Sequence, residues 1–201
     1  MSYEIITALA TFAFVSSITP GPNNLMLMAS GANFGWRLTA PHMLGVGFGF
    51  VFMILMIGLG LSQVFEVFPV SYTILKVFSI AFLLYLALKI ATAAPLKETD
   101  DKPVGTPISF LQAAMFQWVN PKAWAMGLSA ISAFTPHGSG INGVIMVALI
   151  FGVVNIPSIN CWVFLGTQMR RFLNVPWKLR TFNVTAALLL LASLYPILIP
   201  H

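Results

Sequence analysis

Two short polar segments interrupt long apolar stretches of the chain, and both combine proline with asparagine. They are Pro20-Gly21-Pro22-Asn23-Asn24 and Asn120-Pro121-Lys122. Proline removes a backbone donor and clashes with the preceding helical turn, so each segment leaves carbonyl oxygens without helical partners. Free carbonyls and asparagine oxygens attract an ammonium group, whereas the start of the following half-helix attracts a carboxylate. We therefore predict a site that can hold both ends of a zwitterion, with a simple kink as the alternative.

Other polar side chains could join this site. Gln117 lies just before the second segment, and Asn155, Ser158 and Trp162 share one face of a helix at 100° per residue. The predicted substrate-binding residues are Pro20, Gly21, Pro22, Asn23, Asn24, Gln117, Asn120, Pro121, Lys122, Asn155, Ser158 and Trp162.

Lys122 is the basic residue that we predict deep inside an apolar helix. A buried ammonium group needs a partner, and no acidic residue is predicted inside any apolar helix. A substrate carboxylate could be that partner, and so could the carbonyls freed by the prolines. Snorkelling of the ammonium group along its aliphatic stem to an interface is the other interpretation.

The elements that must position these residues are membrane-spanning helices. The chain of 201 residues is 58% hydrophobic and 7% charged, with a mean hydropathy of +0.90. No Asp, Glu, Lys or Arg occurs in 5–36, 38–65 or 123–169, and each stretch exceeds the roughly 20 residues that a helix needs to cross a bilayer. An all-α polytopic membrane protein is expected.

Hydropathy and proline breaks predict six transmembrane helices in one domain over residues 1–201. The predicted spans are 5–28, 41–62, 70–91, 109–131, 142–166 and 181–199. A charged, proline-containing connector at about 93–107 would join a first half (about 1–92) to a second half (about 108–201). Three spans per half predict a 3+3 inverted repeat, with broken helices in spans 1 and 4.

The distribution of basic residues predicts the orientation. The loops that follow the first, third and fifth spans contain or border Arg37, Lys89, Lys97, Lys102, Arg170, Arg171, Lys178 and Arg180. The other two loops contain neither Lys nor Arg. The positive-inside rule then places the three basic loops in the cytoplasm and both termini on the outer side of the membrane.

Several function classes lack the residues that they need. The histidines His42, His137 and His201 are isolated, and Cys161 is the single cysteine, so we expect no metal site. Neither a carboxylate pair within the spans nor a phosphate-binding glycine loop is present, so we expect no cofactor, no use of ATP and no enzymatic activity. The net charge of +5 belongs to loops rather than to a nucleic-acid-binding domain.

Motifs along nearly the whole chain resemble the LysE/RhtB family of bacterial amino-acid exporters. They include 19–23 (TPGPN), 35–37 (GWR), 45–50 (GVGFGF), 82–91 (FLLYLALKIA), 110–123 ending in NPKA, and Arg170-Arg171. The resemblance implies six helices, amino-acid efflux and coupling to the proton gradient. It also implies a bacterial inner membrane, in which the outer termini would be periplasmic. It assigns the motif positions Pro20, Gly21, Pro22, Asn23, Asn120 and Pro121 to the functional core.

Finer features are similar to the cysteine/O-acetylserine exporter branch, namely Asn23-Asn24, 107–110 and 160–162. Other branches often carry an acid where this chain has Phe50, which argues against a dibasic substrate. We therefore expect a gradient-driven exporter of small neutral or hydroxylated amino acids that works in the lipid bilayer, either alone or as a homo-oligomer. The alternatives are a channel or structural membrane subunit and, less favoured, an intramembrane enzyme.

Overall fold

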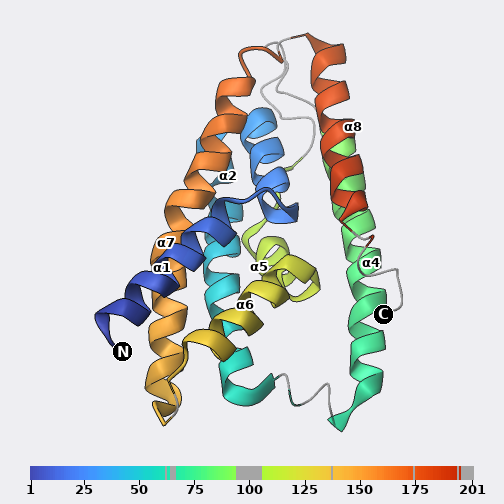
Figure 1. Cartoon of the computed structure of the whole chain (residues 1–201). Helices are drawn as coiled ribbons and strands as arrows, with labels where there is room; N and C mark the ends of the chain where they lie inside the picture. The colour runs from blue at the N-terminus through green and yellow to red at the C-terminus, as the bar shows by residue number, and fades with distance from the viewer. Residues whose placement is uncertain are drawn as a thin grey trace.

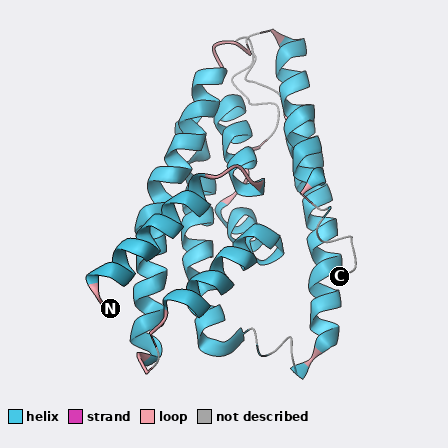
Figure 2. Cartoon of the chain, in the orientation of Figure 1, coloured by secondary structure: helices cyan, strands magenta, loops and turns pink. Residues whose placement is uncertain are grey.

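The computed structural model describes residues 1–61, 63, 67–93, 106–136, 138–173, 175–193 and 195. All regular secondary structure in these residues is helical (Figures 1 and 2). The elements are α1 (Tyr3–Ile18), α2 (Pro22–Met56), the π-helix η1 (Ile57–Leu61), α4 (Pro69–Ala91), α5 (Phe110–Val119), α6 (Pro121–Phe134), α7 (Gly140–Met169) and α8 (Pro176–Ala192). Most of the predicted connector, with Lys97 and Lys102, and the end of the last predicted span lie outside the described residues.

The two predicted interruptions are present. α1 ends at Ile18 and α2 begins at Pro22, whereas α5 ends at Val119 and α6 begins at Pro121. Both following helices carry the proline in their first turn, where its missing N–H would have had no helical partner anyway. By contrast, Pro41 and Pro157 lie inside helices that continue past them.

Within α2 the chain turns back on itself at Gly35, which has a φ of 78° and a ψ of 174°. The hydroxyl oxygens of Ser30 and Thr39 lie 3.1 Å apart, whereas nine residues of straight helix would separate such positions by about 13.5 Å. Glycine adopts this backbone conformation without a Cβ clash. The reversal separates 22–34 from 36–56 and lies in the first predicted loop, next to Arg37.

Three helical segments of the described chain are long and apolar enough to cross a membrane, namely Pro22–Leu61, Thr73–Ala91 and Gly140–Met169. The shorter helix α1 is also apolar. α4 and α7 closely follow the predicted spans 70–91 and 142–166. The first predicted span is the one that differs most, because its second part continues to Gly35 rather than ending at residue 28.

α2 packs most extensively on α7 and then on α5, while α8 packs on α4 and α2. Gly45 and Gly49 allow the close contact with α5, because a Cβ on Gly45 would clash with the Phe110 carbonyl oxygen and one on Gly49 with Ala114. The two glycines therefore serve helix packing.

Two apolar clusters form the core. One includes Met26, Val46 and Phe116, and the other includes Phe50 and Ala123. Consecutive turns of the same face of α2 thus contribute to different clusters, since Val46 and Phe50 are four residues apart. The boundary between the clusters is where both helix interruptions meet.

Candidate functional site

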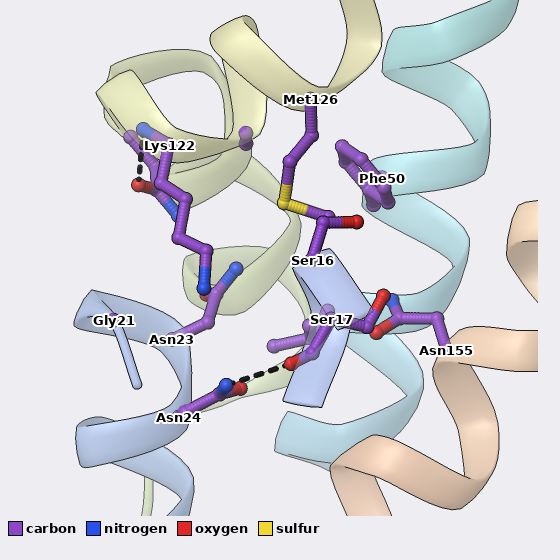
Figure 3. Close-up of a pocket in the computed structure, with 12 residues that line it drawn as sticks. Ser16, Ser17, Gly21, Asn23, Asn24, Phe50, Lys122, Met126 and Asn155 are labelled. Carbon is purple, nitrogen blue, oxygen red and sulfur yellow. Dashed lines mark hydrogen bonds between the residues drawn. The ribbon is translucent and has the colours of Figure 1, made fainter. Parts of the chain in front are cut away.

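A cavity of about 30 Å³ lies between the two interruptions (Figure 3). Its lining includes six of the twelve predicted residues, namely Gly21, Asn23, Asn24, Asn120, Lys122 and Asn155. These residues come from the start of α2, the start of α6 and the middle of α7. The structure therefore brings together residues that are up to 134 positions apart in the sequence.

The last carbonyl oxygens of α1 accept hydrogen bonds from side chains of other segments. The Asn24 amide donates to the carbonyl oxygens of Ser17 and Thr19, at 2.8 Å each. The Trp162 indole of α7 donates to the Ile18 carbonyl oxygen at 3.2 Å. These side chains supply donors to carbonyl oxygens at the end of α1, where the helix stops before Pro20 and Pro22.

Lys122 links the two interruptions directly. Its Nζ donates to the Thr19 carbonyl oxygen at 2.5 Å and approaches the Pro20 carbonyl oxygen at 3.4 Å. Figure 3 shows the side chain extending from α6 toward the start of α2. Of the two partners predicted for this ammonium group, the structure places the freed carbonyls in contact with it.

Asn23 and Gln117 form a reciprocal amide pair. Asn23 Nδ2 donates to Gln117 Oε1 at 2.8 Å, and Gln117 Nε2 donates to Asn23 Oδ1 at 3.2 Å. Gln117 is fully buried and also donates to the Ala113 carbonyl oxygen at 2.8 Å. Gln117 does not line the cavity itself, but its two hydrogen bonds fix the orientation of the Asn23 side chain, which does.

Asn120 caps α6, because its Oδ1 accepts a hydrogen bond from the Lys122 backbone N–H at 3.1 Å. Ser158 is buried and directed back to the Val154 carbonyl oxygen at 3.5 Å. It does not line the cavity, and neither does Trp162. Asn155 is thus the one member of the predicted α7 stripe that reaches the cavity wall.

The three predicted prolines stay outside the lining. Pro20 is exposed and Pro121 is half-buried, whereas Pro22 is buried in the first turn of α2. Their contribution is to end and begin helices, and thereby to free the carbonyls that other residues contact.

Six lining residues were not predicted: Ser16, Ser17, Val46, Phe50, Ala123 and Met126. The two serines could have been found, because they lie four and three positions before the first polar segment. The Ser17 hydroxyl is buried without a hydrogen-bond partner, so it remains available on the cavity side of α1. The apolar members carry no comparable signal in the sequence.

No group of three or more His, Cys, Asp or Glu side chains that could hold a metal ion occurs in the residues that the structure describes. Of the five acidic residues in the sequence, that part of the chain contains Glu4, at the end of α1 remote from the cavity. The chemistry that this arrangement offers is hydrogen bonding and charge recognition of a small polar molecule.

The family model described as LysE type translocator matches residues 14–193. The chain belongs to this family. A LysE type translocator is a multi-pass membrane transporter rather than an enzyme, and the long apolar helices agree with that architecture. The family resemblance predicted from the motifs is confirmed.

Relatives of this LysE type translocator extend over nearly its whole length. A protein of Escherichia coli O139:H28 named cysteine/O-acetylserine efflux protein is 30% identical over 192 residues, which cover 95% of this chain and 96% of the relative. A protein of Shigella sonnei with the same name is 30% identical over 191 residues, covering 94% and 95%. No solved structure matches the chain significantly.

Proposed function

We propose that this LysE type translocator exports small neutral or hydroxylated amino acids, with cysteine and O-acetylserine as the first candidates. The observation that carries the proposal is the pairing of cation-binding carbonyls with a helix start at one cavity. The Thr19 carbonyl oxygen already accepts a hydrogen bond from an ammonium group, that of Lys122. A substrate ammonium has the same donors.

The start of α2 offers the complementary charge. Gly21 is its N-cap and contributes no side-chain hydrogen bond, so no cap competes for the backbone donors of the first turn. Helix starts attract carboxylates through these N–H groups and the helix dipole. An amino acid lying along the cavity would direct its carboxylate to this turn and its ammonium group to the end of α1.

The cavity wall suits a neutral side chain. Phe50 and Met126 give it an apolar surface, and no described lining residue is acidic. A second positive charge on a dibasic substrate would therefore have no counter-charge here. The names of the two relatives, which mention cysteine and O-acetylserine, agree with a small neutral substrate.

The cavity of about 30 Å³ has room for a few water molecules at most, and an amino acid is larger. Binding therefore requires α1 and α6 to move apart around the interruptions. We interpret this arrangement as the closed stage of an alternating-access cycle, in which one half of the chain rocks against the other.

We propose six membrane passes arranged as a 3+3 inverted repeat. Each half begins with an interrupted helix, α1 with 22–34 and then α5 with α6, and continues with two further helices. The end of α7 and the start of α8 lie at one end of the bundle (Figure 1). Arg170 and Arg171 directly follow α7, and Arg170 Nη1 is close to Gly35. The positive-inside rule makes this end cytoplasmic and both termini periplasmic in the inner membrane.

We further propose that the transporter is driven by a gradient, with the proton gradient as the first candidate. The described residues supply no nucleotide-binding element, and the sequence contains no phosphate-binding glycine loop. A secondary transporter of this kind is expected to exchange internal for external substrate even without a net driving force.

Counterflow in proteoliposomes tests the proposal. Vesicles loaded with unlabelled cysteine, O-acetylserine, serine or lysine are diluted into a trace of the same labelled compound. We expect saturable accumulation of label for the neutral compounds and none for lysine. A channel or a structural subunit would give no counterflow, and accumulation of lysine alone would overturn the neutral-substrate proposal.

A further inference from the structure

The Lys122 ammonium group binds where a transported ammonium group is expected to bind. Its two contacts, at 2.5 Å to the Thr19 carbonyl oxygen and 3.4 Å to the Pro20 carbonyl oxygen, involve backbone acceptors that the first interruption frees. We call these two oxygens the carbonyl site. Such acceptors take any R–NH3⁺ donor with little regard to the rest of the molecule.

The chain leaves space for the Lys122 stem at the first interruption. A Cβ atom on Gly21 would lie 2.7 Å from Lys122 Cδ and 3.2 Å from Nζ. Gly21 has a φ of −175° in extended backbone, which any residue can adopt. The glycine is therefore needed for the close passage of the lysine stem rather than for its backbone conformation.

The partners of Lys122 carry no full negative charge. Glu4, the described acidic residue, lies at the far end of α1, and 16 residues of helix span about 24 Å. The ammonium group is thus held by dipoles alone, which bind a cation less firmly than a carboxylate does. A ligand that brings its own ammonium group and its own carboxylate can compete for this site.

Building on the amino-acid exporter proposed above, we propose that Lys122 is a tethered substitute for the substrate ammonium group. The lysine occupies the carbonyl site when the transporter carries no substrate, and the substrate ammonium group displaces it on binding. The carbonyls of the first interruption are thereby partnered in both the loaded and the unloaded transporter.

This role separates two modes of transport. Exchange uses only substrate-loaded forms, in which the substrate partners the carbonyl site. Net efflux also requires the unloaded protein to reorient. Without Lys122 the carbonyl site would then lack an ammonium donor, so that the Thr19 carbonyl oxygen keeps the Asn24 amide and the Pro20 carbonyl oxygen loses its lysine contact. A hydrogen bond to a charged group and a tenfold change in rate correspond to similar free energies. We therefore expect the unloaded transporter without Lys122 to reorient roughly tenfold more slowly, or slower still.

The first experiment compares net efflux with counterflow for Lys122→Met in proteoliposomes. We expect net efflux of the substrate to fall about tenfold or more while counterflow stays within about threefold of wild type. Lys76→Met is the matched control, because Lys76 lies in α4 away from the cavity, and it should change neither flux. Equal loss of both fluxes, or loss of neither, overturns the proposal.

Gly21→Ala provides a second variant that keeps the lysine. The added methyl group forces the Lys122 stem to shift, so net efflux should fall more than counterflow, by a smaller factor than in Lys122→Met. A Gly21→Ala protein with unchanged net efflux contradicts the proposal even if Lys122→Met does not fold.

The second experiment measures chemical rescue. Ethylammonium should raise the unfolding temperature of purified Lys122→Met and leave that of wild type unchanged, because only the variant leaves the carbonyl site without its lysine. Tetramethylammonium, which has no N–H donor, is the control and should have no effect. Absence of rescue, or equal stabilisation of wild type, overturns the assignment of the carbonyl site.

The two experiments separate this inference from the exporter proposal. Wild-type protein without amino-acid counterflow overturns the exporter and the transport role of Lys122 with it. Ethylammonium rescue does not depend on transport and decides whether the carbonyl site binds ammonium. Normal counterflow without rescue leaves the exporter intact and overturns the tethered substitute.

Discussion

The two helix interruptions meet at one cavity, yet their backbone groups obtain hydrogen-bond partners from different places. The second interruption finds its partners locally. The Asn120 side chain caps α6, and the Asn120 backbone N–H donates to the Gln117 carbonyl oxygen at 3.3 Å. The first depends on other segments. The carbonyls at the end of α1 accept from Asn24 of α2, Trp162 of α7 and Lys122 of α6.

The difference indicates which side of the cavity changes during transport. A helix end that caps itself keeps its geometry when neighbouring helices move, so the start of α6 is a fixed support for Lys122. The end of α1 must exchange hydrogen bonds whenever α6 or α7 shifts. We therefore expect substrate to compete for the first interruption and to leave the second one intact.

The largest expected effect comes from Asn24→Ala compared with Asn120→Ala. Asn24→Ala removes two hydrogen bonds at once, one to the buried Ser17 carbonyl and one to the Thr19 carbonyl, which we expect to lower the free energy of unfolding by about 2–3 kcal/mol. Asn120→Ala removes one local cap, with an expected loss of about 1 kcal/mol. Thermal unfolding of the purified variants in detergent measures both.

Equal losses for the two variants would show that both interruptions depend on tertiary contacts to the same degree, which would contradict a self-contained second interruption. Asn160→Ala serves as the control, because this half-buried amide contacts neither interruption. It donates to the Ile156 carbonyl oxygen of its own helix and accepts from the exposed Trp36 indole. It should change the unfolding temperature little.

Much of the fold follows from local signals that the sequence displays. The prolines at 22 and 121 predict both interruptions, because proline tolerates the first turn of a helix and no later one without distortion. The span over 70–91 is bounded by Pro69 and the connector, so its ends are within one residue of the prediction. The residue at which the chain reverses, Gly35, was predicted less precisely than these ends, since a glycine in the sequence does not reveal its φ angle.

The site was predictable in its residue types and less so in its geometry. Asn23 was expected to point to substrate, but its side-chain amide is paired with Gln117, 94 positions away. Trp162 was expected on the cavity wall and instead donates to Ile18. Such pairings depend on how α5 and α7 pack against α1 and α2, and polar residue types on one helix face do not specify their partners.

A smaller effect is expected from the amide pair of Asn23 and Gln117. Either alanine variant leaves the other amide without its partner next to the cavity, with an expected loss of about 1–2 kcal/mol in the free energy of unfolding. The double variant should lose less than the sum, because the two groups share their hydrogen bonds. A double-mutant cycle by thermal unfolding gives the coupling.

Strict additivity in this cycle would contradict the pair and would free Asn23 to face the substrate. Coupling with normal counterflow kinetics would instead make the pair a support for α2. This pair is a direct side-chain link between the first interruption and the helix that precedes the second, so the cycle measures how strongly the two are coupled.

The smallest expected effect is that of Trp162→Phe, which removes a single donor and retains most of the ring. The Ile18 carbonyl oxygen then loses its partner at 3.2 Å, and we expect a loss of about 0.5–1.5 kcal/mol in the free energy of unfolding. Trp36→Phe is the matched control, since Trp36 is exposed and donates to Asn160 at the surface, also at 3.2 Å. If the end of α1 depends on hydrogen-bond donors from other helices, Trp162→Phe must lower the unfolding temperature more than Trp36→Phe does. The same variant should also raise the counterflow of substrate at low concentration or leave it unchanged, because a less constrained α1 exposes its carbonyls more readily. A variant as stable as the control would mean that Ile18 gains nothing from the indole, and that the first interruption is held by Asn24 and Lys122 alone.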